Sequence, residues 1–468
     1  MGDLHGHLTS THSKVHADSN HLFVFELSRG HGDTTNPCNP TSTSEVRVKN
    51  VSSAPILGAI LEHDVIVVGA GPAGLIAAAD IARKGHDVIV LEEHGTIGVP
   101  DHCAGLLSIS GLKTLGLHPP SDVIQNVISG ARIHAPSGLS IEINRSKKEA
   151  LVIDRRKFDE WLGLRAEEHG AKIVTRSRAV NIRIDRSRGC TVTIQGAEHR
   201  RLTSKSVINA EGFRGVISKT LGLPAVPKSA KYPAYQYEMS NVHFSQDQVH
   251  MFYGRKFAPG FFAWMIPLGD GRARVGLASM NRSKMRLDAA RHHHPVIHDW
   301  VRDAKIERGF GGVVLVGMPV KRFSVDRALG VGDSIGMVKP TTGGGVILGG
   351  QTARIAAQVL SGQLEREDLS VRGLGHFDKG CRVIVKREIR PMHIAQRALT
   401  LLTDKGLDSV IRDARDLNLL DIVKREGDMD YQGRVISRLL QNPRMVLVGL
   451  RAIRHINPFM NGWKGGVH

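Results

Sequence analysis

The chain has 468 residues and a net charge of +18, so it can bury a large core and is not a small disulfide-stabilised module. Its four cysteines are scattered and lack zinc-type spacing, which indicates reduced thiols in a cytoplasmic protein. No apolar run approaches the roughly 20 residues that a membrane-spanning helix needs, so we expect no transmembrane segment.

The first 60 residues differ from the rest in composition. They are rich in Ser, Thr, His, Asn and Gly and show no sustained hydrophobic period. Such a composition predicts a disordered N-terminal extension over residues 1–60. Its histidines are irregularly spaced, and we expect no metal site there or elsewhere in the chain.

Residues 64–93 predict a strand, a glycine-rich turn, a helix and a second strand. An apolar, β-branched run suits a buried parallel strand, and Gly69, Gly71 and Gly74 follow it directly. The first glycine permits a tight turn, the second lets the backbone approach a pyrophosphate, and the third lets helix and strand pack closely. Glu92 ends the second strand, where it can accept hydrogen bonds from ribose hydroxyls. This order of elements predicts a dinucleotide site at the start of the helix.

Further pieces of an α/β domain follow along the chain. Residues 151–159 lead into an amphipathic helix, and short apolar strands are expected at 172–174 and 206–210. Glycines at 342–345 then precede a helix over Val346–Leu360, and the pattern is mostly helical after residue 366. Residues 230–320 alternate between apolar and polar. This alternation predicts antiparallel strands at Tyr235–Met239, Val249–Tyr253, Phe261–Ile266 and Ala273–Ala278. His292, His293 and His294 are interpreted as a solvated turn before Pro295.

The expected fold class is therefore α/β. A Rossmann-type dinucleotide-binding domain occupies residues 61–225 and 323–365, and an antiparallel-sheet substrate domain is inserted at 226–322. A helical C-terminal region covers residues 366–468.

The C-terminal segment Gln432–His468 combines positive charge with apolar residues. It carries six basic residues and no acid, and its apolar residues recur at helical spacing. This pattern is typical of a helix lying on an anionic bilayer. A basic outer face on helices that pack against the protein has the same pattern, and sequence alone does not separate the two.

Five ordered motifs carry a resemblance to a known family. They are the glycine fingerprint with Glu92, the cysteine segment 98–105, Arg155-x-x-Phe158-Asp159, Ala210-Glu211-Gly212, and Gly332-Asp333 followed by Pro340 and Gly343–Gly345. In these the chain resembles the aromatic-hydroxylase group of flavoproteins. The aromatic stretch 259–267 resembles the geranylgeranyl reductase family within it. That family usually has Tyr at the position of Phe262 and Phe at that of Ile266, and the wider group has Asp at that of Glu211.

The resemblance implies FAD as the cofactor. Together with the fingerprint, it places FAD against Gly69, Gly71, Ala73, Gly74, Glu92, Glu93, Cys103, Ala104, Arg155, Glu211, Gly212, Asp333, Gly343, Gly344 and Gly345. Cys103 is the expected catalytic residue, beside the flavin ring. The alternatives are an inert buried cysteine, a surface ion pair for Arg155 and a turn aspartate for Asp333.

The implied reaction is reduction of isolated double bonds in geranylgeranyl chains, as in archaeal membrane lipids. Tyr253, Phe261, Phe262 and Trp264 are expected to line a tunnel for the prenyl chain, although aromatic residues at a period of two also occur as ordinary sheet core. The alternatives are an FAD monooxygenase of an aromatic or apolar substrate, and a basic membrane- or nucleic-acid-binding protein with a vestigial flavin fold.

No second glycine fingerprint precedes a helix, so no separate nicotinamide domain is expected. Electrons would come from NAD(P)H or a ferredoxin. The expected location is cytoplasmic and peripheral, at the anionic inner face of the cell membrane. No nucleic-acid partner is expected.

Overall fold

The computed structural model describes residues 62–145, 147–196 and 201–456. The predictions of disorder and of no metal site over residues 1–60 lie outside these ranges. So do residues 457–468, the end of the basic C-terminal segment.

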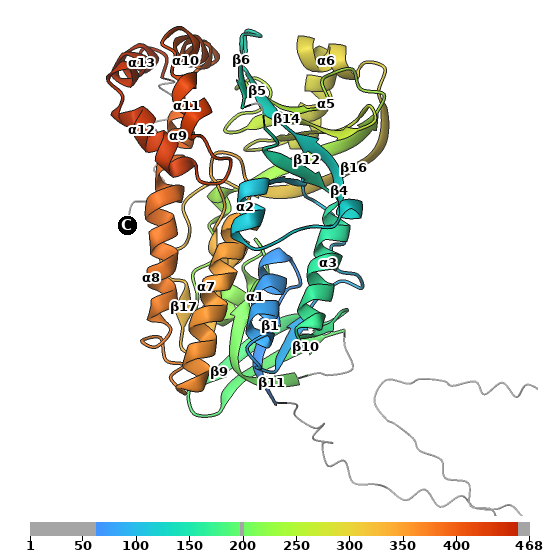
Figure 1. Cartoon of the computed structure of the whole chain (residues 1–468), viewed down its shortest axis with the longest axis vertical. Helices are drawn as coiled ribbons and strands as arrows, with labels where there is room; N and C mark the ends of the chain where they lie inside the picture. The colour runs from blue at the N-terminus through green and yellow to red at the C-terminus, as the bar shows by residue number, and fades with distance from the viewer. Residues whose placement is uncertain (1–61, 146, 197–200, 457–468) are drawn as a thin grey trace, which may run out of the picture. The chain divides into compact units, whose positions relative to one another are not determined.

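The dinucleotide-binding part is built on a sheet that has eight strands within the described residues, in the order β17-β18-β11-β1-β2-β8, with β10 beside β11 and β9 beside β10 (Figure 1). The strands are β1 (Glu62–Val68), β2 (Val88–Leu91), β8 (Lys172–Val174), β9 (Arg178–Asp185), β10 (Gly189–Gln195), β11 (Arg201–Asn209), β17 (Ser324–Val325) and β18 (Ala328–Gly330). The central strand β1 pairs in parallel with β2 and β11, so its apolar run is buried on both faces, as predicted.

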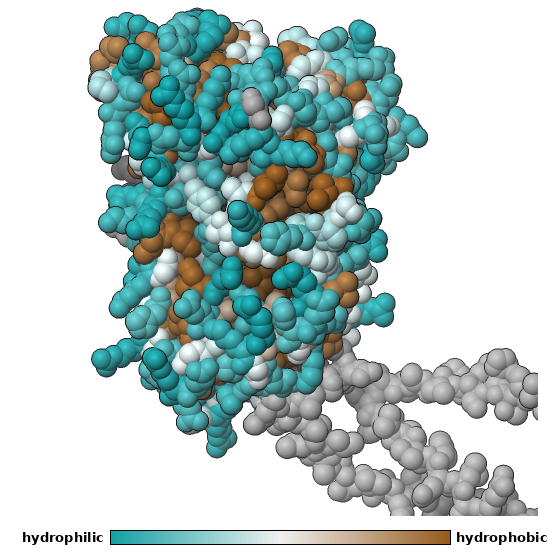
Figure 2. Space-filling view, in the orientation of Figure 1, coloured by the Kyte–Doolittle hydropathy of each residue, from teal (hydrophilic) through white to brown (hydrophobic). Residues whose placement is uncertain are grey.

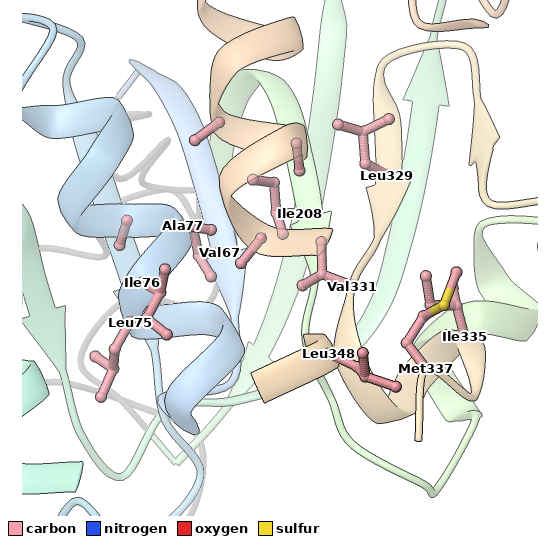
Figure 3. Packing of buried hydrophobic residues seen from close by; sticks show 14 of the residues in the cluster. Val67, Leu75, Ile76, Ala77, Ile208, Leu329, Val331, Ile335, Met337 and Leu348 are labelled. Carbon is pink, nitrogen blue, oxygen red and sulfur yellow. The ribbon is translucent and has the colours of Figure 1, made fainter. Parts of the chain in front are cut away.

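Helices α1 (Pro72–Ala82) and α7 (Val346–Glu365) contact each other beside this sheet. Figure 3 shows side chains from both helices and from β1, β11 and β18 gathered in one buried cluster. Helix α1 begins with proline directly after Gly71. A Cβ atom at Gly74 would lie 2.0 Å from the carbonyl oxygen of Gly69, so only glycine allows the close packing that the fingerprint predicts.

A second sheet has seven strands within the described ranges and faces the cofactor part of the molecule. Its order is β16-β12-β15-β14-β13-β5-β6, mostly antiparallel. The strands are β5 (Gly130–His134), β6 (Ser140–Asn144), β12 (Lys231–Ser240), β13 (Gln248–Tyr253), β14 (Phe262–Gly269), β15 (Arg272–Ala278) and β16 (Lys305–Leu315). Strands β5 and β6 precede the segment 226–322, and the sequence pattern did not indicate them.

The remaining elements connect and cover these two sheets. Strands β3 (Leu106–Ser108), β4 (Ile124–Ile128) and β7 (Ala150–Ile153) form a small sheet between them. The other helices are α2 (Ile109–Thr114), α3 (Arg155–Glu168), α4 (Val216–Thr220), α5 (Ser283–His293), α6 (Pro295–Val301), α8 (Gly375–Ile384), α9 (Arg390–Leu401), α10 (Asp404–Asp416), α11 (Leu420–Glu426), α12 (Gln432–Gln441) and α13 (Pro443–Ile453).

The predicted turn at His292–His294 is wrong. The first two histidines are the last residues of α5, and they are exposed. His294 is the N-cap of α6, where its Nδ1 accepts a hydrogen bond from the backbone N–H of Ile297, and its ring contacts Phe252. A capping histidine packed on an aromatic ring has little freedom, which the tripeptide alone does not reveal.

The C-terminal helices pack beside the second sheet (Figure 1). The backbone N–H of Arg255, after β13, donates to Asp404 at 2.6 Å, and that of Ser137, between β5 and β6, donates to Asp408 at 2.9 Å. Among the helices that the structure describes, none is long and apolar enough to cross a bilayer. The α/β class with a sheet domain and a helical C-terminal region is confirmed.

Candidate active site

A cavity of about 1480 Å³ lies between the glycine fingerprint, the second sheet and the C-terminal helices. All of the residues predicted to contact cofactor or substrate line it: Gly69, Gly71, Ala73, Gly74, Glu92, Glu93, Cys103, Ala104, Arg155, Glu211, Gly212, Tyr253, Phe261, Phe262, Trp264, Asp333, Gly343, Gly344 and Gly345. These residues are spread over almost 280 positions of the chain, and the fold brings them together.

The fingerprint leaves room where a phosphate would bind. A Cβ atom at Gly71 would meet nothing within 4 Å, so this glycine is not required by protein packing. The free N–H groups of the first turn of α1 favour an anion at the same place. Glu92 is held ready at the end of β2, because its carboxylate accepts from the backbone N–H groups of Ala70 and His94, both at 2.9 Å.

Two more of the predicted acids, Glu93 and Glu211, have protein partners. Glu93 forms ion pairs with Arg178 at 3.5 Å and Arg214 at 3.0 Å. Glu211 accepts at the start of α4 from the backbone N–H of Ile217 at 2.9 Å and that of Ser218 at 2.6 Å. The carboxylate of Glu211 therefore caps a helix, which explains an acid at this position without a cofactor contact.

Cys103 lies on a loop that is fixed from two sides. Its backbone N–H donates to Asp101 Oδ1 at 3.2 Å, and its carbonyl oxygen accepts from Gln236 Nε2 at 3.1 Å. The same amide of Gln236 accepts from the indole N–H of Trp264 at 3.1 Å. The predicted catalytic cysteine and the predicted tunnel aromatic are thus joined through one buried side chain.

A buried arginine is hydrogen-bonded to the backbone of this loop. Arg274 has 1% of its surface exposed, and its Nη1 donates to the carbonyl oxygens of Ala104 at 3.0 Å and Ile153 at 3.1 Å. Its Nε donates to Glu238 at 2.8 Å, and Glu238 also pairs with Arg308, whose guanidinium reaches Asp101 at 3.1 Å. The network holds both ends of the cysteine loop.

Arg155 faces the cavity from the start of α3. Its guanidinium bonds to both carboxylate oxygens of Asp159, at 3.0 and 2.8 Å. Burial alone would lower the pKa of Arg155, but Asp159 and Cys103 more than offset this and raise it. Burial also raises the pKa of Asp333, and Arg155 partly opposes that shift. The ion pair foreseen for Arg155 exists with Asp159, but it is largely buried, with 15% of the Arg155 side chain and 6% of the Asp159 side chain exposed.

The four predicted tunnel aromatics form one wall of the cavity. The rings of Phe261 and Phe262 are stacked with centroids 4.3 Å apart, and Phe262 contacts Tyr253 at 5.4 Å and Trp264 at 6.1 Å. Burial raises the pKa of Tyr253, so its phenol stays protonated at neutral pH. A Cβ atom at Gly343 would lie 3.6 Å from the ring of Phe261, which puts this wall beside the second glycine loop.

Comparison with known proteins fits this geometry. The FAD binding domain family matches residues 62–388. The chain is 34% identical over 387 residues to digeranylgeranylglycerophospholipid reductase 2 of Methanopyrus kandleri, covering 81% of this chain and 97% of that protein. It is 31% identical to digeranylgeranylglycerophospholipid reductase 1 of Methanothermobacter thermautotrophicus, covering 76% and 92%.

The chain belongs to the geranylgeranyl reductase family of FAD flavoproteins. A solved structure of a geranylgeranyl bacteriochlorophyll reductase-like protein from Thermoplasma acidophilum has a TM-score of 0.74 and 26% identity, covering 84% of this chain and 99% of that one. The halogenase PltM in complex with FAD shares the fold, with a TM-score of 0.61 at 15% identity. The protein is therefore an FAD-dependent reductase, and the predicted cofactor is confirmed.

The residues of this reductase fit FAD. The first turn of α1 would hold the pyrophosphate and Glu92 the ribose, while Asp333 and Gly343–Gly345 line the same cavity farther along. These last residues lie at the wall that carries Phe261, so the flavin ring would reach the aromatic side chains. Individual contacts of the other predicted residues stay predictions.

Sequence reasoning missed the far end of the cavity. It is lined by apolar side chains of β5, β6 and the C-terminal helices: Ile133, Ile141, Ile143, Val410, Ile411, Ala414, Leu419, Leu420, Val423, Val435, Ile436, Leu439, Met445 and Val448. It also missed Lys339 and Arg274. The signal for the helices was present as apolar residues at helical spacing, but that signal does not say whether they face a core or a cavity.

Proposed function

We propose that the enzyme saturates isolated double bonds in geranylgeranyl chains of an archaeal-type glycerophospholipid or of a prenyl diphosphate. The names of the similar reductases support the glycerophospholipid as the first choice. The cofactor would supply a hydride to one carbon of the double bond.

The observation that carries this proposal is the apolar end of the cavity. The cavity volume of about 1480 Å³ includes both the cofactor site and this apolar end. Beyond the aromatic wall it runs between the second sheet and the C-terminal helices, where its lining is almost entirely aliphatic. Such a space suits a long hydrocarbon chain threaded past the flavin rather than a compact aromatic substrate.

The protein's own residues would solve two problems of this chemistry. An isolated double bond has no carbonyl group to polarise it, so its reduction is difficult. Water must be kept away from the site of hydride transfer, and a proton must reach the second carbon. Phe261, Phe262 and Trp264 would exclude water. Cys103 and Tyr253 both line the cavity and carry an S–H and an O–H group, so either can deliver the proton.

The test is anaerobic turnover of a geranylgeranyl glycerophospholipid by chemically reduced enzyme, followed by mass spectrometry. We expect the mass to rise by two hydrogen atoms for each saturated bond. Turnover that requires oxygen and yields a hydroxylated product would instead support the monooxygenase alternative. Supplying geranylgeranyl diphosphate in parallel identifies the preferred prenyl acceptor.

The electron donor is proposed to be NAD(P)H or a reduced ferredoxin that approaches the flavin directly. The positive charge of the chain favours an acidic ferredoxin by electrostatic steering. Rapid-mixing absorbance measurements with each donor will identify it. A ferredoxin should reduce the flavin more slowly as salt increases, whereas NAD(P)H at saturating concentration should be much less affected.

We also propose that the enzyme binds the anionic face of a membrane through α13. Four large apolar residues of this helix are strongly exposed: Val446 (61%), Leu447 (48%), Leu450 (59%) and Ile453 (60%). They recur at helical spacing and so share one face. On the opposite face Met445 and Val448 line the cavity. Figure 2 shows hydrophobic surface among hydrophilic residues where these helices lie.

This arrangement puts one helix between the bilayer and the proposed chain-binding space. A lipid substrate could then enter the cavity without crossing water. Arg444 and Arg454 are exposed, although the guanidinium of Arg444 also donates to the carbonyl oxygen of Leu417 at 2.9 Å. Both would meet anionic head groups, each contributing about 1 kcal/mol. Arg438 and Arg451 already pair with Glu426 and Asp413, so they are poorer choices for a binding test.

Vesicle flotation tests the membrane proposal. The triple change Val446→Ser, Leu450→Ser and Ile453→Ser should abolish binding to vesicles of phosphatidylglycerol and phosphatidylcholine. Leu164→Ser is the matched control, since Leu164 on α3 is 59% exposed but lies away from α13. Arg444→Gln with Arg454→Gln should weaken binding mainly at low salt. Equal flotation of all variants would refute the proposal. Loss of self-association in the triple variant would also refute it, because a second copy of the chain would then cover this face.

A further inference from the structure

A buried ion pair lies beside the second glycine loop, and neither of its residues is among the predicted site residues. Lys339 and Asp430 have only 3% and 1% of their surface exposed, and the Lys339 ammonium pairs with the Asp430 carboxylate. Lys339 Nζ also donates to the carbonyl oxygen of Met429 at 3.1 Å. Burying two charges away from water has a cost in folding free energy, which indicates that the position of the ammonium has a function.

The ammonium lies against the glycine loop that would face the flavin. Lys339 begins this loop, since its carbonyl oxygen accepts from the N–H of Gly343 at 2.8 Å and its N–H donates to Gly344 at 3.1 Å. Its side chain folds back over the loop, so that a Cβ atom at Gly344 would lie 3.1 Å from Nζ. Both Lys339 and Gly344 line the cavity. An ammonium has three N–H groups, and two are used by Asp430 and Met429.

Asp430 holds the pair from the other side. It precedes α12, in the loop that joins α11 to α12. Its second oxygen accepts from Ser108 Oγ, and a Cβ atom at Gly111 would lie 2.4 Å from it. The carboxylate is therefore fixed between α2 and the glycine loop, with the ammonium on the cavity side.

We propose that Lys339 is the positive charge that stabilises the negative charge of the reduced flavin, and that Asp430 limits its strength. The inference rests on the placement of the flavin ring against Gly343–Gly345. A flavin gains negative charge on reduction, and a fixed cation in a site of low dielectric constant favours that form. The start of α7 directly after the loop acts in the same direction.

The two members of the pair then have opposite effects on the flavin. Lys339→Met removes the cation and leaves the carboxylate, so the reduced form is destabilised. Asp430→Asn removes the carboxylate and leaves the cation unopposed, so the reduced form is stabilised. A pair that only fixes the C-terminal segment would give shifts of the same sign in both variants, because either change breaks the same contact.

The experiment measures the reduction potential of the bound flavin by dye equilibration, together with its affinity for sulfite, which rises with positive charge near the ring. We expect Lys339→Met to lower the sulfite affinity about tenfold, and a tenfold change in equilibrium constant corresponds to about 30 mV in a two-electron potential. Asp430→Asn should shift both quantities the other way. Lys339→Arg keeps the charge and should stay near the parent protein.

The matched control is Asp413→Asn, which breaks the ion pair with Arg451 on the C-terminal helices without touching the glycine loop. It should leave the potential unchanged. Shifts of the same sign in Lys339→Met and Asp430→Asn, or an unchanged potential in Lys339→Met, would overturn the proposal. If Lys339→Met does not fold, Lys339→Gln takes its place with the same expected sign, and Asp430→Ala replaces Asp430→Asn in the same way; an unchanged potential in the replacement variant overturns the proposal equally. Neither readout involves lipid turnover, so this test fails or succeeds independently of the proposed substrate.

Discussion

Gly71 offers a way to remove the cofactor without disturbing the protein. Its backbone angles, φ −78° and ψ 173°, are accessible to any residue, and a Cβ atom there would meet no protein atom within 4 Å. Gly71→Ala should therefore change the free energy of unfolding by less than about 1 kcal/mol, since the lower entropy of the unfolded chain favours it slightly. Gly71→Val should fold as well.

FAD binding should respond very differently. In both Gly71→Ala and Gly71→Val the added side chain occupies the space that the pyrophosphate needs. It would push the phosphates away from the N–H groups of α1. Hydrogen bonds to charged groups are worth about 1.5–3 kcal/mol each, so losing two costs about 3–6 kcal/mol. With about 1.4 kcal/mol for each factor of ten, the Kd should rise roughly 10²- to 10⁴-fold.

The assay is titration of apoprotein with FAD, followed by flavin fluorescence, beside thermal unfolding of each variant. Gly362→Ala is the control for a harmless change, since a Cβ atom there also meets nothing within 4 Å and the residue lies in α7. Gly74→Ala is the control for lost packing, and its Tm should fall. Tight FAD binding by a folded Gly71→Val protein would refute the placement of the pyrophosphate.

Three further predictions concern other parts of the molecule. Cys103→Ala should slow lipid reduction by about 10²-fold or more while the flavin spectrum is retained, measured as the initial rate of mass gain; an unchanged rate would leave Tyr253 as the proton donor. Arg274→Met should lower the free energy of unfolding by about 3–5 kcal/mol in urea titrations, because Glu238 and two carbonyl oxygens lose a buried partner; a loss below about 1 kcal/mol would contradict its role under the cysteine loop. Burial lowers the pKa of His134 to about 3 and that of His250 to about 4. These values lie below the usual histidine pKa of about 6.5, so the unfolded chain takes up protons before the folded one does as the pH falls. The free energy of unfolding should therefore decrease as pH drops from about 6.5 toward 4, by up to about 1.4 kcal/mol per pH unit for each histidine. His250→Phe should reduce that slope in urea titrations at several pH values.

The cofactor part was accessible from sequence because its signals are local. Gly69, Gly71 and Gly74 stand between an apolar strand pattern and a helical one, and β1, α1 and β2 form as expected. The same holds for the glycines before α7. Where a motif carries its own geometry within a few residues, the sequence suffices.

The rest depends on contacts between distant segments. Strand β5 joins the second sheet through parallel pairing with β13, more than 100 residues later, and β6 pairs with β5. The partner of Lys339 is 91 positions away. Glu211 has a role that its motif does not indicate, since its carboxylate caps α4; its contact with the cofactor stays a prediction. Nothing in the local sequence pattern indicates any of these three contacts.

The amide of Gln236 links two positions that an engineer would wish to vary separately. It donates to the carbonyl oxygen of Cys103 and accepts from Trp264, so both ends of one side chain are used. Replacing Trp264 to reshape the chain-binding space would leave a buried amide oxygen without a donor, and the amide could then turn and release the cysteine loop. Changes in chain-length preference at this wall should therefore require a second, compensating substitution at position 236. Libraries that vary the two positions together should recover active variants that single-site libraries miss.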